Sequence, residues 1–420
     1  MKKCIFTVCA CNYLSQALCL AESVEVIHSE VDFYIYIVDR PVTEGAMPRS
    51  NEIRFCDELG ILGYEQLAFK YTVIEFSTAV KPFIFQRLFE NDGYDSVIYL
   101  DPDIVLFDRL DEAFSKLENA AIVLTPHFLT LEEKYTGCVP LTEILWVGAY
   151  NCGFVALSGG SRGRSIARWW ACRLYDQGYA DKIEGLHVDQ KWMDLLDCVI
   201  PNDWLHVLRN VGYNVAFWNL HERRLVMRGK KYYVAGRLGL IQNEILPMVF
   251  FHFSGFNPNN LSILHKRHPQ YNIENFPEYE PLMLEYAEAI LRNRYNLYSA
   301  LEYRYNYFDN GAPIYQFYRR LYRSMLNMPN IDTRAPFRTN TADSVYNAFV
   351  SNRLLIQKKG SAITHSSIGK TEISKKKKYL ELVFKLMHWV LGARNYFYLT
   401  KVMEHYGRPE AHSFLLKRQN

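Results

Sequence analysis

The chain has 420 residues, of which 49% are hydrophobic and 22% charged, and its formal net charge is +3. These values suit a globular protein with one large domain or two smaller ones. The charge is uneven, because residues 351–420 hold 14 Lys and Arg against 4 Asp and Glu, whereas residues 1–350 hold 34 against 41. This distribution argues against a protein that binds nucleic acid along its whole length and favours an enzyme with a basic appendage.

The cysteines and the N-terminus indicate the expected compartment. Nine cysteines, an odd number, contain no CxxC pair, so the pattern predicts neither a disulfide framework nor a zinc site. Met1-Lys2-Lys3 and the following apolar run imitate a signal peptide, but the run is short and no small-x-small cleavage site follows. We expect a first buried strand here and a cytoplasmic protein, and no apolar run reaches the ~18 residues that cross a bilayer.

The first 130 residues alternate between short apolar runs and helix-length amphipathic segments. Strands are predicted over 5–9, 33–38, 71–76 and 97–100, and helices over 14–28, 56–67 and 82–91. This alternation is typical of an α/β fold with a mostly parallel sheet covered on both faces. Ligands bind such sheets beyond the carboxyl ends of the strands, where Asn12-Tyr13 and Asp101-Pro102-Asp103 fall.

The rest of the chain predicts further segments. A helix is expected over 280–305, and a second one over 379–405 follows four consecutive lysines at 375–378. The Ser/Thr/Asn/Lys-rich stretch between them lacks periodicity. We therefore predict a catalytic domain (1–270), a helical extension packed on it (271–328), a flexible linker (329–374) and a basic amphipathic helical segment (375–420).

Asp101 and Asp103 are the first candidate metal ligands. In an extended backbone, residues i and i+2 point the same way, so both carboxylates can address one target. Hard oxygen ligands suit Mg²⁺ or Mn²⁺, which bind through one or two carboxylates plus the phosphates of a substrate. The alternative is a pair of aspartates in a surface turn that Pro102 bends.

Four further blocks follow the DPD triplet in a fixed order. They are NCGF (151–154), VDQKWMD (188–194), GYNVAFWN (212–219) and FHFSGF (251–256). Together with the triplet, they resemble the retaining GT-A glycosyltransferases of the glycogenin and lipopolysaccharide galactosyltransferase type, glycosyltransferase family eight, and in particular enzymes of bacterial polysaccharide and surface-glycan synthesis. The resemblance covers about residues 1–270. It implies a GT-A fold, a Rossmann-like mixed sheet flanked by helices that binds a nucleotide-sugar, here with a helical C-terminal extension.

The resemblance also implies roles for individual residues. Asp101, Asp103 and His252 match the ligands of a divalent ion, Mn²⁺ or Mg²⁺, that sits on the diphosphate of a nucleotide-sugar donor. Such an ion assists the leaving nucleoside diphosphate as a Lewis acid. The matches to the donor site are Asn12 and Tyr13 beside the base, Lys81 near the donor, and Gly255 in the histidine's own block. The matches to the reacting centre are Asn151 near the transferred sugar and the pair Asp189 and Gln190 at its reacting face.

Two positions depart from the family pattern. Ala10 stands where many relatives that use UDP-sugars have an acidic residue to read uracil, so the base stays open, with UDP favoured. Pro258 stands where the glycogenin-like group has a lysine that clamps the diphosphate. Lys266 or Arg267 is the expected replacement, because both side-chain types bind phosphate well.

Each assignment has a structural alternative. His252 could be a core histidine of an apolar strand. Asp189 could cap a helix that begins at Lys191, since Asp is a favoured N-cap. Asn151 could be a turn residue that tolerates a left-handed backbone.

The leading hypothesis is a metal-dependent glycosyltransferase that moves a sugar to a glycan or lipid-linked glycan acceptor with retention. The alternatives are inversion with Asp189 as general base, a sugar nucleotidyltransferase, and a non-catalytic carbohydrate-binding or scaffold protein. The nucleotidyltransferase is disfavoured, because residues 10–14 after the first strand contain neither glycine nor a basic residue.

The tail has its own set of expectations. Glu381, Lys385 and His388 share one helical face behind the four lysines, and apolar side chains cover most of the remainder. A basic amphipathic helix of this kind fits an anionic membrane surface at the inner face of the cell membrane. The alternatives are docking of residues 375–405 on a partner enzyme or on the chain's own core.

Overall fold

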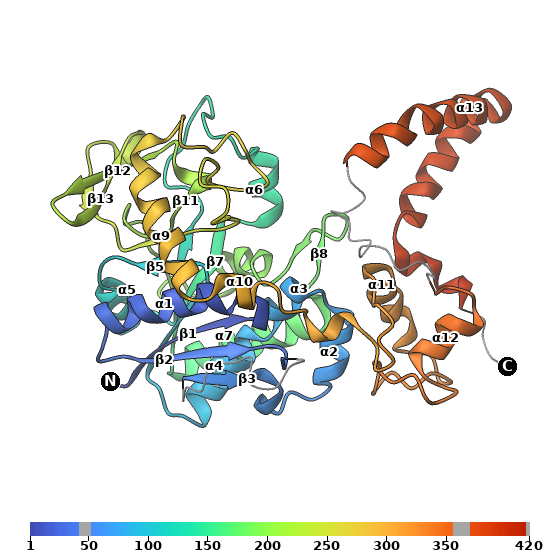
Figure 1. The fold of residues 1–420 in the computed structure, drawn as a ribbon, viewed down its shortest axis with the longest axis horizontal. Helices are drawn as coiled ribbons and strands as arrows, with labels where there is room; N and C mark the ends of the chain where they lie inside the picture. The colour runs from blue at the N-terminus through green and yellow to red at the C-terminus, as the bar shows by residue number, and fades with distance from the viewer. Residues whose placement is uncertain (42–51, 356–369, 417–420) are drawn as a thin grey trace. The chain divides into compact units, whose positions relative to one another are not determined.

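The computed structural model describes residues 1–41, 52–355 and 370–416. Its central element is a seven-stranded sheet in the order β10-β6-β7-β4-β1-β2-β3 (Figure 1). The strands are β1 (Lys3–Cys9), β2 (Asp32–Ile37), β3 (Ile53–Phe55), β4 (Ser96–Leu100), β6 (Ile122–Pro126), β7 (Tyr150–Ser158) and β10 (Leu205–Val207). Only β7 runs antiparallel to its neighbours β4 and β6; the other pairs are parallel. The predicted mixed α/β sheet is confirmed.

Helices cover both faces of this sheet because alternate residues of its strands are buried on opposite sides. In β1, Ile5 lies in a core cluster with Leu14 and Leu20 of α1 (Leu14–Ile27). The next residue, Phe6, packs edge-on against Phe85 of α4 (Lys81–Glu90), with ring centroids 4.9 Å apart. Helix α7 (Ser161–Gln177) packs against α4 on that second face.

A smaller sheet brings a distant segment to the end of β4. Strand β15 (Phe250–His252) pairs antiparallel with β5 (Ile104–Leu106) and parallel with β11 (Val215–Ala216). Its register sets His252 opposite Ile104, immediately after Asp103. This pairing brings the two parts of the predicted metal site together.

The described chain contains further helices and strands. They are the sheet β12 (Arg223–Arg228), β13 (Lys231–Gly236) and β14 (Ile245–Pro247), the pair β8 (Ala180–Asp181) and β9 (Leu186–His187), and the helices α2 (Tyr64–Lys70), α3 (Val73–Ala79), α5 (Asp111–Lys116), α6 (Leu141–Val147), α8 (Leu196–Val199), α9 (Glu280–Arg292), α10 (Tyr295–Tyr298), α11 (Gln316–Met325), α12 (Val345–Ser351) and α13 (Lys370–Tyr406).

Some local predictions differ from the structure. The segment 71–76, predicted as a strand, belongs largely to α3, since the buried positions 75, 76, 79 and 80 follow a helical rather than a two-residue period. The predicted helix 56–67 is split into a 3-10 turn (Cys56–Leu59) and α2, because Gly60 and Gly63 between them have φ of 72° and 69°. The predicted helix 280–305 is interrupted at Arg294, whose φ is 60°.

The structure also divides the chain differently from the predicted domains. One compact unit contains Met1–Ile61 and Ile74–Tyr303, and the other contains Leu62–Val73 and Arg304–Asn420. Residues 62–73 join the second unit because the buried Arg319 of α11 donates hydrogen bonds to the carbonyls of Ala68, Phe69 and Tyr71. Arginine has donors only, so three carbonyl acceptors satisfy its guanidinium well.

The predicted linker 329–374 contains ordered structure. Helix α12 lies inside it, and the side chains of Val345 and Phe349 are fully buried in the core of the second unit. Phe349 stacks on Tyr318 with centroids 4.8 Å apart. The sequence analysis missed this helix because its segment is rich in polar residues and only one side of the helix is buried. Residues 356–369 of the predicted linker lie outside the described chain.

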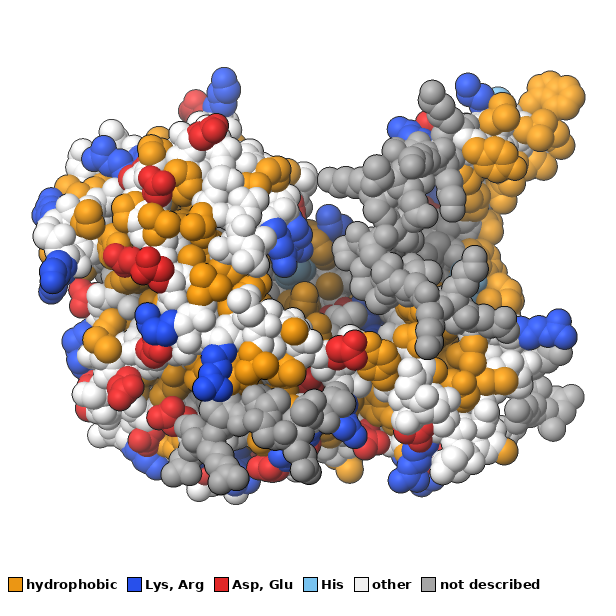
Figure 2. Space-filling model, in the orientation of Figure 1, with side chains coloured by type: hydrophobic (Ala, Val, Ile, Leu, Met, Phe, Trp, Pro, Cys, Tyr) orange, Lys and Arg blue, Asp and Glu red, His pale blue; other side chains and the backbone are white. Residues whose placement is uncertain are grey.

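Helix α13 confirms the predicted helical C-terminal segment. Gly392, with φ of 70°, divides it into two arms. Many apolar side chains on both arms are exposed, including Leu382, Trp389 and Phe397, and Figure 2 shows hydrophobic side chains gathered along this helix. No helix in the described ranges is long and apolar enough to cross a membrane.

Candidate metal centre

Asp101 and Asp103 lie in the turn that joins β4 to β5. The amide of Ile104 donates to the carbonyl of Asp101 (3.0 Å), which closes the turn. The two carboxylates therefore converge because the chain bends, and not because an extended strand directs them to one side, as the sequence spacing suggested. Pro102, at the centre of the turn, fits such a bend.

His252, at the end of β15, completes a cluster of three possible ligands. Its Nε2 lies 3.1 Å from Asp103 Oδ1 and 3.5 Å from Asp101 Oδ2. One ligand atom from each residue lies within 4.8 Å of the other two. Two carboxylate oxygens and an imidazole nitrogen at this spacing fit a divalent ion such as Mn²⁺ or Mg²⁺.

In both Asp101 and Asp103, the carboxylate oxygen that does not face His252 accepts a hydrogen bond from a tyrosine hydroxyl. Tyr99 donates to Asp101 Oδ1 (2.5 Å), and Tyr13 donates to Asp103 Oδ2 (3.1 Å). The oxygens that remain, Asp101 Oδ2 and Asp103 Oδ1, are those that face His252. Each aspartate thus offers one oxygen to an ion.

The charges of this cluster shift its pKa values. Burial raises the pKa of Asp103, but the charge of His252 and the hydrogen bonds from His252 and Tyr13 outweigh burial and bring the pKa below its usual value. Burial lowers the pKa of His252, and the charge of Asp103 overcomes this effect and raises it. Asp103 therefore keeps its ionised carboxylate form, which suits a cation.

Lys81 and Asp189 form a buried ion pair beside the cluster. Lys81 Nζ lies 2.8 Å from Asp189 Oδ2 and 3.5 Å from Asp101 Oδ1, and the Lys81 and Asp189 side chains are 3% and 2% exposed. Lys81 also donates to the carbonyl of Cys152 (3.0 Å). Burial raises the pKa of Asp189, which the charge of Lys81 partly offsets. Lys81 thus links an expected metal ligand to a residue expected at the sugar.

The backbone at Asp189 is unusual. Val188, immediately before it, has φ of 42°, a left-handed conformation that a β-branched residue rarely adopts. Its amide donates to the carbonyl of Tyr179 (2.9 Å), which holds this conformation. Asp189 does not cap the following 3-10 helix (Lys191–Leu195), whose N-cap is Gln190 without a side-chain cap. The capping alternative is wrong.

Asn151 and Gln190 connect the cluster to strand β7. Asn151 Nδ2 donates to Gln190 Oε1 (3.3 Å), and His252 Nδ1 lies 3.3 Å from Asn151 Oδ1. The backbone amide of Cys152 donates to the same Gln190 oxygen (2.9 Å), and Gln190 Nε2 donates to the carbonyl of Val147 (2.9 Å). Asn151 lies within a nine-residue strand, so the turn alternative is wrong as well.

The other predicted donor-site residues have weaker links to the cluster. Asn12 lies beside Tyr13 in a 3-10 turn after β1. Gly255, with φ of 68°, packs against the buried ring of His265, where a Cβ would come within 2.4 Å. Lys266 and Arg267 are exposed just after that ring. No contact recorded in the described part of the chain joins Asn12, Lys266 or Arg267 to the three candidate ligands.

Tyr99 is the functional candidate that the sequence analysis missed. It sits two residues before Asp101 on β4, and its side chain is 1% exposed. The apolar strand around it makes it look like an ordinary core residue. Its spacing from Asp101 is the signal that could have indicated a contact, because positions i and i+2 of a strand share a face.

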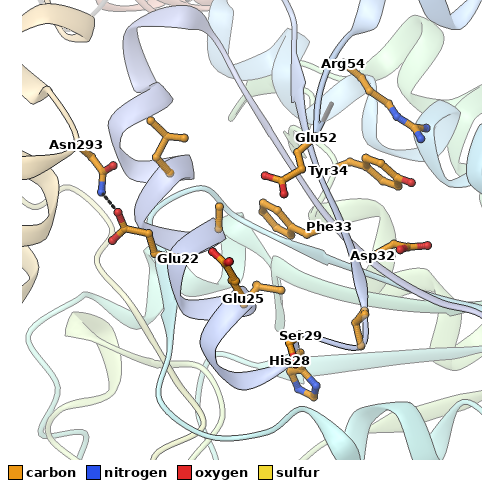
Figure 3. Close-up of a pocket in the computed structure, with 14 residues that line it drawn as sticks. Glu22, Glu25, His28, Ser29, Asp32, Phe33, Tyr34, Glu52, Arg54 and Asn293 are labelled. Atoms are coloured by element: carbon orange, nitrogen blue, oxygen red, sulfur yellow. Dashed lines mark hydrogen bonds between the residues drawn. The ribbon is translucent and has the colours of Figure 1, made fainter. Parts of the chain in front are cut away.

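A cavity elsewhere in the first unit has no link to these residues. It has a volume of about 660 Å³ and lies between α1 and β2, lined by acidic side chains that include Glu22, Glu25 and Glu52 (Figure 3). Asn293 donates to Glu22 at its rim (2.9 Å). None of the predicted site residues lines it.

No family model matches the chain. Two curated proteins of Bacillus subtilis (strain 168) are similar to it. The uncharacterized protein YfnF is 21% identical over 254 residues, which are 60% of this chain and 80% of YfnF. The uncharacterized protein YfnD is 24% identical over 196 residues, which are 44% of this chain and 55% of YfnD.

Solved structures of glycosyltransferases are also similar to the chain. The galactosyltransferase LgtC, solved with donor and acceptor sugar analogs, is 18% identical, with a TM-score of 0.39 over 68% of this chain and 99% of LgtC. The bifunctional glycosyltransferase WbbM is 12% identical, with a TM-score of 0.39 over 70% of this chain and 51% of WbbM.

Proposed function

We propose that the chain is a metal-dependent GT-A glycosyltransferase of the family eight type. It transfers a sugar from a nucleotide-diphosphate donor to a glycan or lipid-linked glycan. The observation that carries this proposal is the convergence of Asp101, Asp103 and His252 at the carboxyl end of β4. Ligands bind open α/β sheets at that edge, and a divalent ion there can hold a diphosphate.

The ion, Mn²⁺ or Mg²⁺, would neutralise negative charge that develops on the departing nucleoside diphosphate. Around it, we assign Asn12 and Tyr13 to the base and the exposed Lys266 and Arg267 to the diphosphate. Gly255 supports this assignment, because it lets the histidine block pack tightly on the loop that carries the two basic residues. The nucleotide base of the donor is not assigned, and UDP is the first nucleotide to test.

Retention is the proposed stereochemistry. Asp189, the carboxylate assigned to the reacting face of the sugar, is already neutralised by Lys81 at 2.8 Å. A carboxylate in such a pair is a weak nucleophile. A front-face route, in which the leaving phosphate takes the acceptor proton, asks only that Lys81 and Asp189 orient the sugar.

Inversion is the second candidate, and one observation favours it. Burial raises the pKa of Asp189 above its usual value, as a general base requires. The anomeric configuration of the product, read by NMR, decides between the two. A retained anomer supports the front-face route, whereas an inverted anomer assigns Asp189 as the base.

The experiment that tests the function is a donor panel. Purified protein is incubated with UDP-, GDP- and TDP-sugars with Mn²⁺ or with EDTA, and release of nucleoside diphosphate is measured. We expect release from one donor class, loss of release in EDTA and recovery on adding Mn²⁺. Asp103→Asn should lower turnover by orders of magnitude, while Glu118→Gln, which changes an exposed acid of the same unit, should not.

Other results of the donor panel would support a different function. Pyrophosphate release from a nucleoside triphosphate and a sugar phosphate would identify a nucleotidyltransferase. Binding of carbohydrate without any release, from every donor and with every metal, would identify a non-catalytic protein. Full activity in EDTA would contradict the metal-dependent mechanism.

We further propose a place for the reaction in bacterial polysaccharide or surface-glycan synthesis. The supporting feature is the tail, since a lipid-linked acceptor resides at a membrane and the exposed apolar side chains of α13 fit the lipid surface. Of the four lysines at 375–378, only the side chain of Lys377 is among those described, and it is exposed. The alternative is that residues 375–405 dock on a partner enzyme.

A further inference from the structure

The amide of Gln190 is fixed in one orientation by the backbone. Its Nε2 lies 2.9 Å from the carbonyl of Val147, which can only accept a hydrogen bond. Its Oε1 lies 2.9 Å from the amide of Cys152, which can only donate one. If the amide were turned by 180°, Oε1 would face the Val147 carbonyl, acceptor against acceptor, and Nε2 would face the Cys152 amide, donor against donor. The observed orientation is therefore the only one that satisfies both partners.

Gln190 in turn fixes the amide of Asn151. Gln190 Oε1 is an acceptor, so the atom of Asn151 that faces it at 3.3 Å is the donor Nδ2. Asn151 Oδ1 therefore points to the other side, where it lies 3.3 Å from His252 Nδ1. Because this oxygen can only accept, His252 Nδ1 carries a hydrogen.

The nitrogen that His252 offers to an ion follows from these contacts. Without an ion, Nε2 lies 3.1 Å from a carboxylate oxygen and donates a hydrogen to it. An ion would take the place of that hydrogen, and because the other hydrogen stays on Nδ1, the lone pair of Nε2 is left for the ion. Nε2 is the nitrogen that faces Asp103 Oδ1 and Asp101 Oδ2 at 3.1 and 3.5 Å. The chain thus presents the metal-binding nitrogen of its histidine to the two carboxylate oxygens.

We propose that Gln190 and Asn151 are positioning residues that hold His252 in the metal-binding tautomer. The inference rests on the proposed function, and it gives Gln190 a different role from the one that the resemblance implies. Both lone pairs of Gln190 Oε1 are engaged, by Cys152 and Asn151, so this oxygen is not available to the sugar.

The packing around the histidine ring supports the same role. Gly153 follows Asn151 on β7, and a Cβ at Gly153 would lie 2.6 Å from His252 Cε1 and 2.8 Å from Asn151 Oδ1. The indole of Trp218 packs edge-on against the other side of the ring, with centroids 5.2 Å apart. The ring therefore has little freedom to turn, and its hydrogen bond to Asn151 sets which nitrogen faces the ion.

The test is a Mn²⁺ titration of the full chain, followed by electron paramagnetic resonance, with and without UDP. We expect Asn151→Ala and Gln190→Ala each to weaken Mn²⁺ binding by about 10-fold or more, as loss of an outer-shell partner does. Asn210→Ala is the matched control. Asn210 Nδ2 donates to Glu112 and its Oδ1 accepts from the amide of Gly212, without contact to the cluster.

The double variant tests whether the two residues act in series. If Gln190 acts through Asn151, Gln190→Ala should cost no further Mn²⁺ affinity in an Asn151→Ala background. At saturating Mn²⁺, the Gln190→Ala enzyme should regain most of its kcat. Should circular dichroism show that a variant is unfolded, Gln190→Glu replaces it, because it keeps the volume and sets an oxygen against the Val147 carbonyl.

Wild-type Mn²⁺ affinity in Gln190→Ala, with kcat lost at every Mn²⁺ concentration, would overturn the inference and assign Gln190 to the chemical step. Additive losses in the double variant would also overturn it. A wild-type protein that binds no Mn²⁺, with or without UDP, would instead refute the proposed function. The two failures are therefore distinguishable.

Discussion

The tyrosine hydroxyls on the two aspartates decide which carboxylate oxygens an ion can use. Tyr99 occupies Asp101 Oδ1 and Tyr13 occupies Asp103 Oδ2, which leaves the oxygens that face His252. Lys81 adds to this arrangement, because its Nζ lies over the Tyr99 ring at 4.0 Å. The ligands are therefore oriented before an ion binds, which lowers the cost of binding.

Tyr99→Phe tests this arrangement at the level of one hydroxyl. We expect about a 10-fold loss of Mn²⁺ affinity, because Asp101 loses the hydrogen bond that orients it. Tyr94→Phe is the control, since Tyr94 is buried in the same unit and donates to Asp32 Oδ2 (2.6 Å). Isothermal titration calorimetry with Mn²⁺ and UDP measures the affinities. Equal losses in the two variants would show that Tyr99 acts only through stability.

At the scale of single residues, the sequence identifies candidate ligands but not the contacts between side chains. Asp101, Asp103 and His252 can be chosen as candidates from their chemistry and their position at strand ends, and the structure brings them together. The partners of Lys81 cannot, because Asp189 and the Cys152 carbonyl reach it from segments 108 and 71 positions away along the printed sequence. Only the folded sheet creates such contacts.

Strand β7 is the element that carries the site. It is the single antiparallel strand of the main sheet, and it supplies Asn151, the Cys152 amide and Gly153. The amide of Asp101 donates to the carbonyl of Gly153 (2.8 Å), so β7 also holds the start of the aspartate turn. Gly153 lets His252 approach the strand closely.

Gly153→Ala should therefore displace the His252 ring. A Cβ 2.6 Å from His252 Cε1 is closer than side chains tolerate, and we expect Mn²⁺ affinity to fall by at least about 10-fold. Gly160→Ala, just after the same strand, is the control, because its Cβ would meet no atom closer than 3.9 Å. Electron paramagnetic resonance of bound Mn²⁺ gives the comparison. Unchanged affinity in Gly153→Ala would show that the ring can move without cost.

Element boundaries explain where prediction from sequence failed. The strands β1, β2 and β4 were predictable from their apolar runs. Helix α3 was not, because its short apolar segment fits either period until the burial of positions 75, 76, 79 and 80 is known. Helix α12 was missed because Val345 and Phe349 stand in a polar sequence, and their partner Tyr318 lies in another helix.

At the scale of the whole molecule, two buried histidines, His127 and His265, and the half-buried His187 predict that the free energy of unfolding falls in acid. Burial lowers the pKa of His127 and His187 to about 4 and that of His265 to about 3. The unfolded chain holds these groups near pKa 6.5, so below pH 6.5 it binds more protons than the folded chain. Below pH 6.5, each of these histidines therefore lowers the free energy of unfolding by about 1.4 kcal/mol per pH unit, until the pH reaches the pKa of the group in the folded chain.

The melting temperature should accordingly fall between pH 6.5 and pH 4, and differential scanning calorimetry measures it. His187→Gln should make this fall shallower, because one of the three groups is removed. His405→Gln, which changes an exposed histidine of α13, should leave the slope unchanged. A slope that neither variant alters would assign the acid sensitivity to carboxylates instead.

The exposed tail sets a second expectation at this scale. Trp389 is 81% exposed and Phe397 is 67% exposed, on the two arms that meet at Gly392. We expect full-length protein to sediment with liposomes in proportion to their anionic lipid content, and Trp389→Ala to weaken this binding. Glu404→Gln, an exposed control on the same helix, should not. Equal sedimentation of all three proteins would favour a docking role for the tail.

We propose that Asp101, Asp103 and His252 hold one divalent ion on the donor diphosphate. A crystal soaked with Mn²⁺ and UDP, with diffraction data collected at the manganese absorption edge, would reveal such an ion. We expect one anomalous peak bonded to Asp101 Oδ2, Asp103 Oδ1, His252 Nε2 and the diphosphate oxygens, and its disappearance in Asp103→Asn. A diphosphate bound without such a peak, or a peak elsewhere, would contradict it.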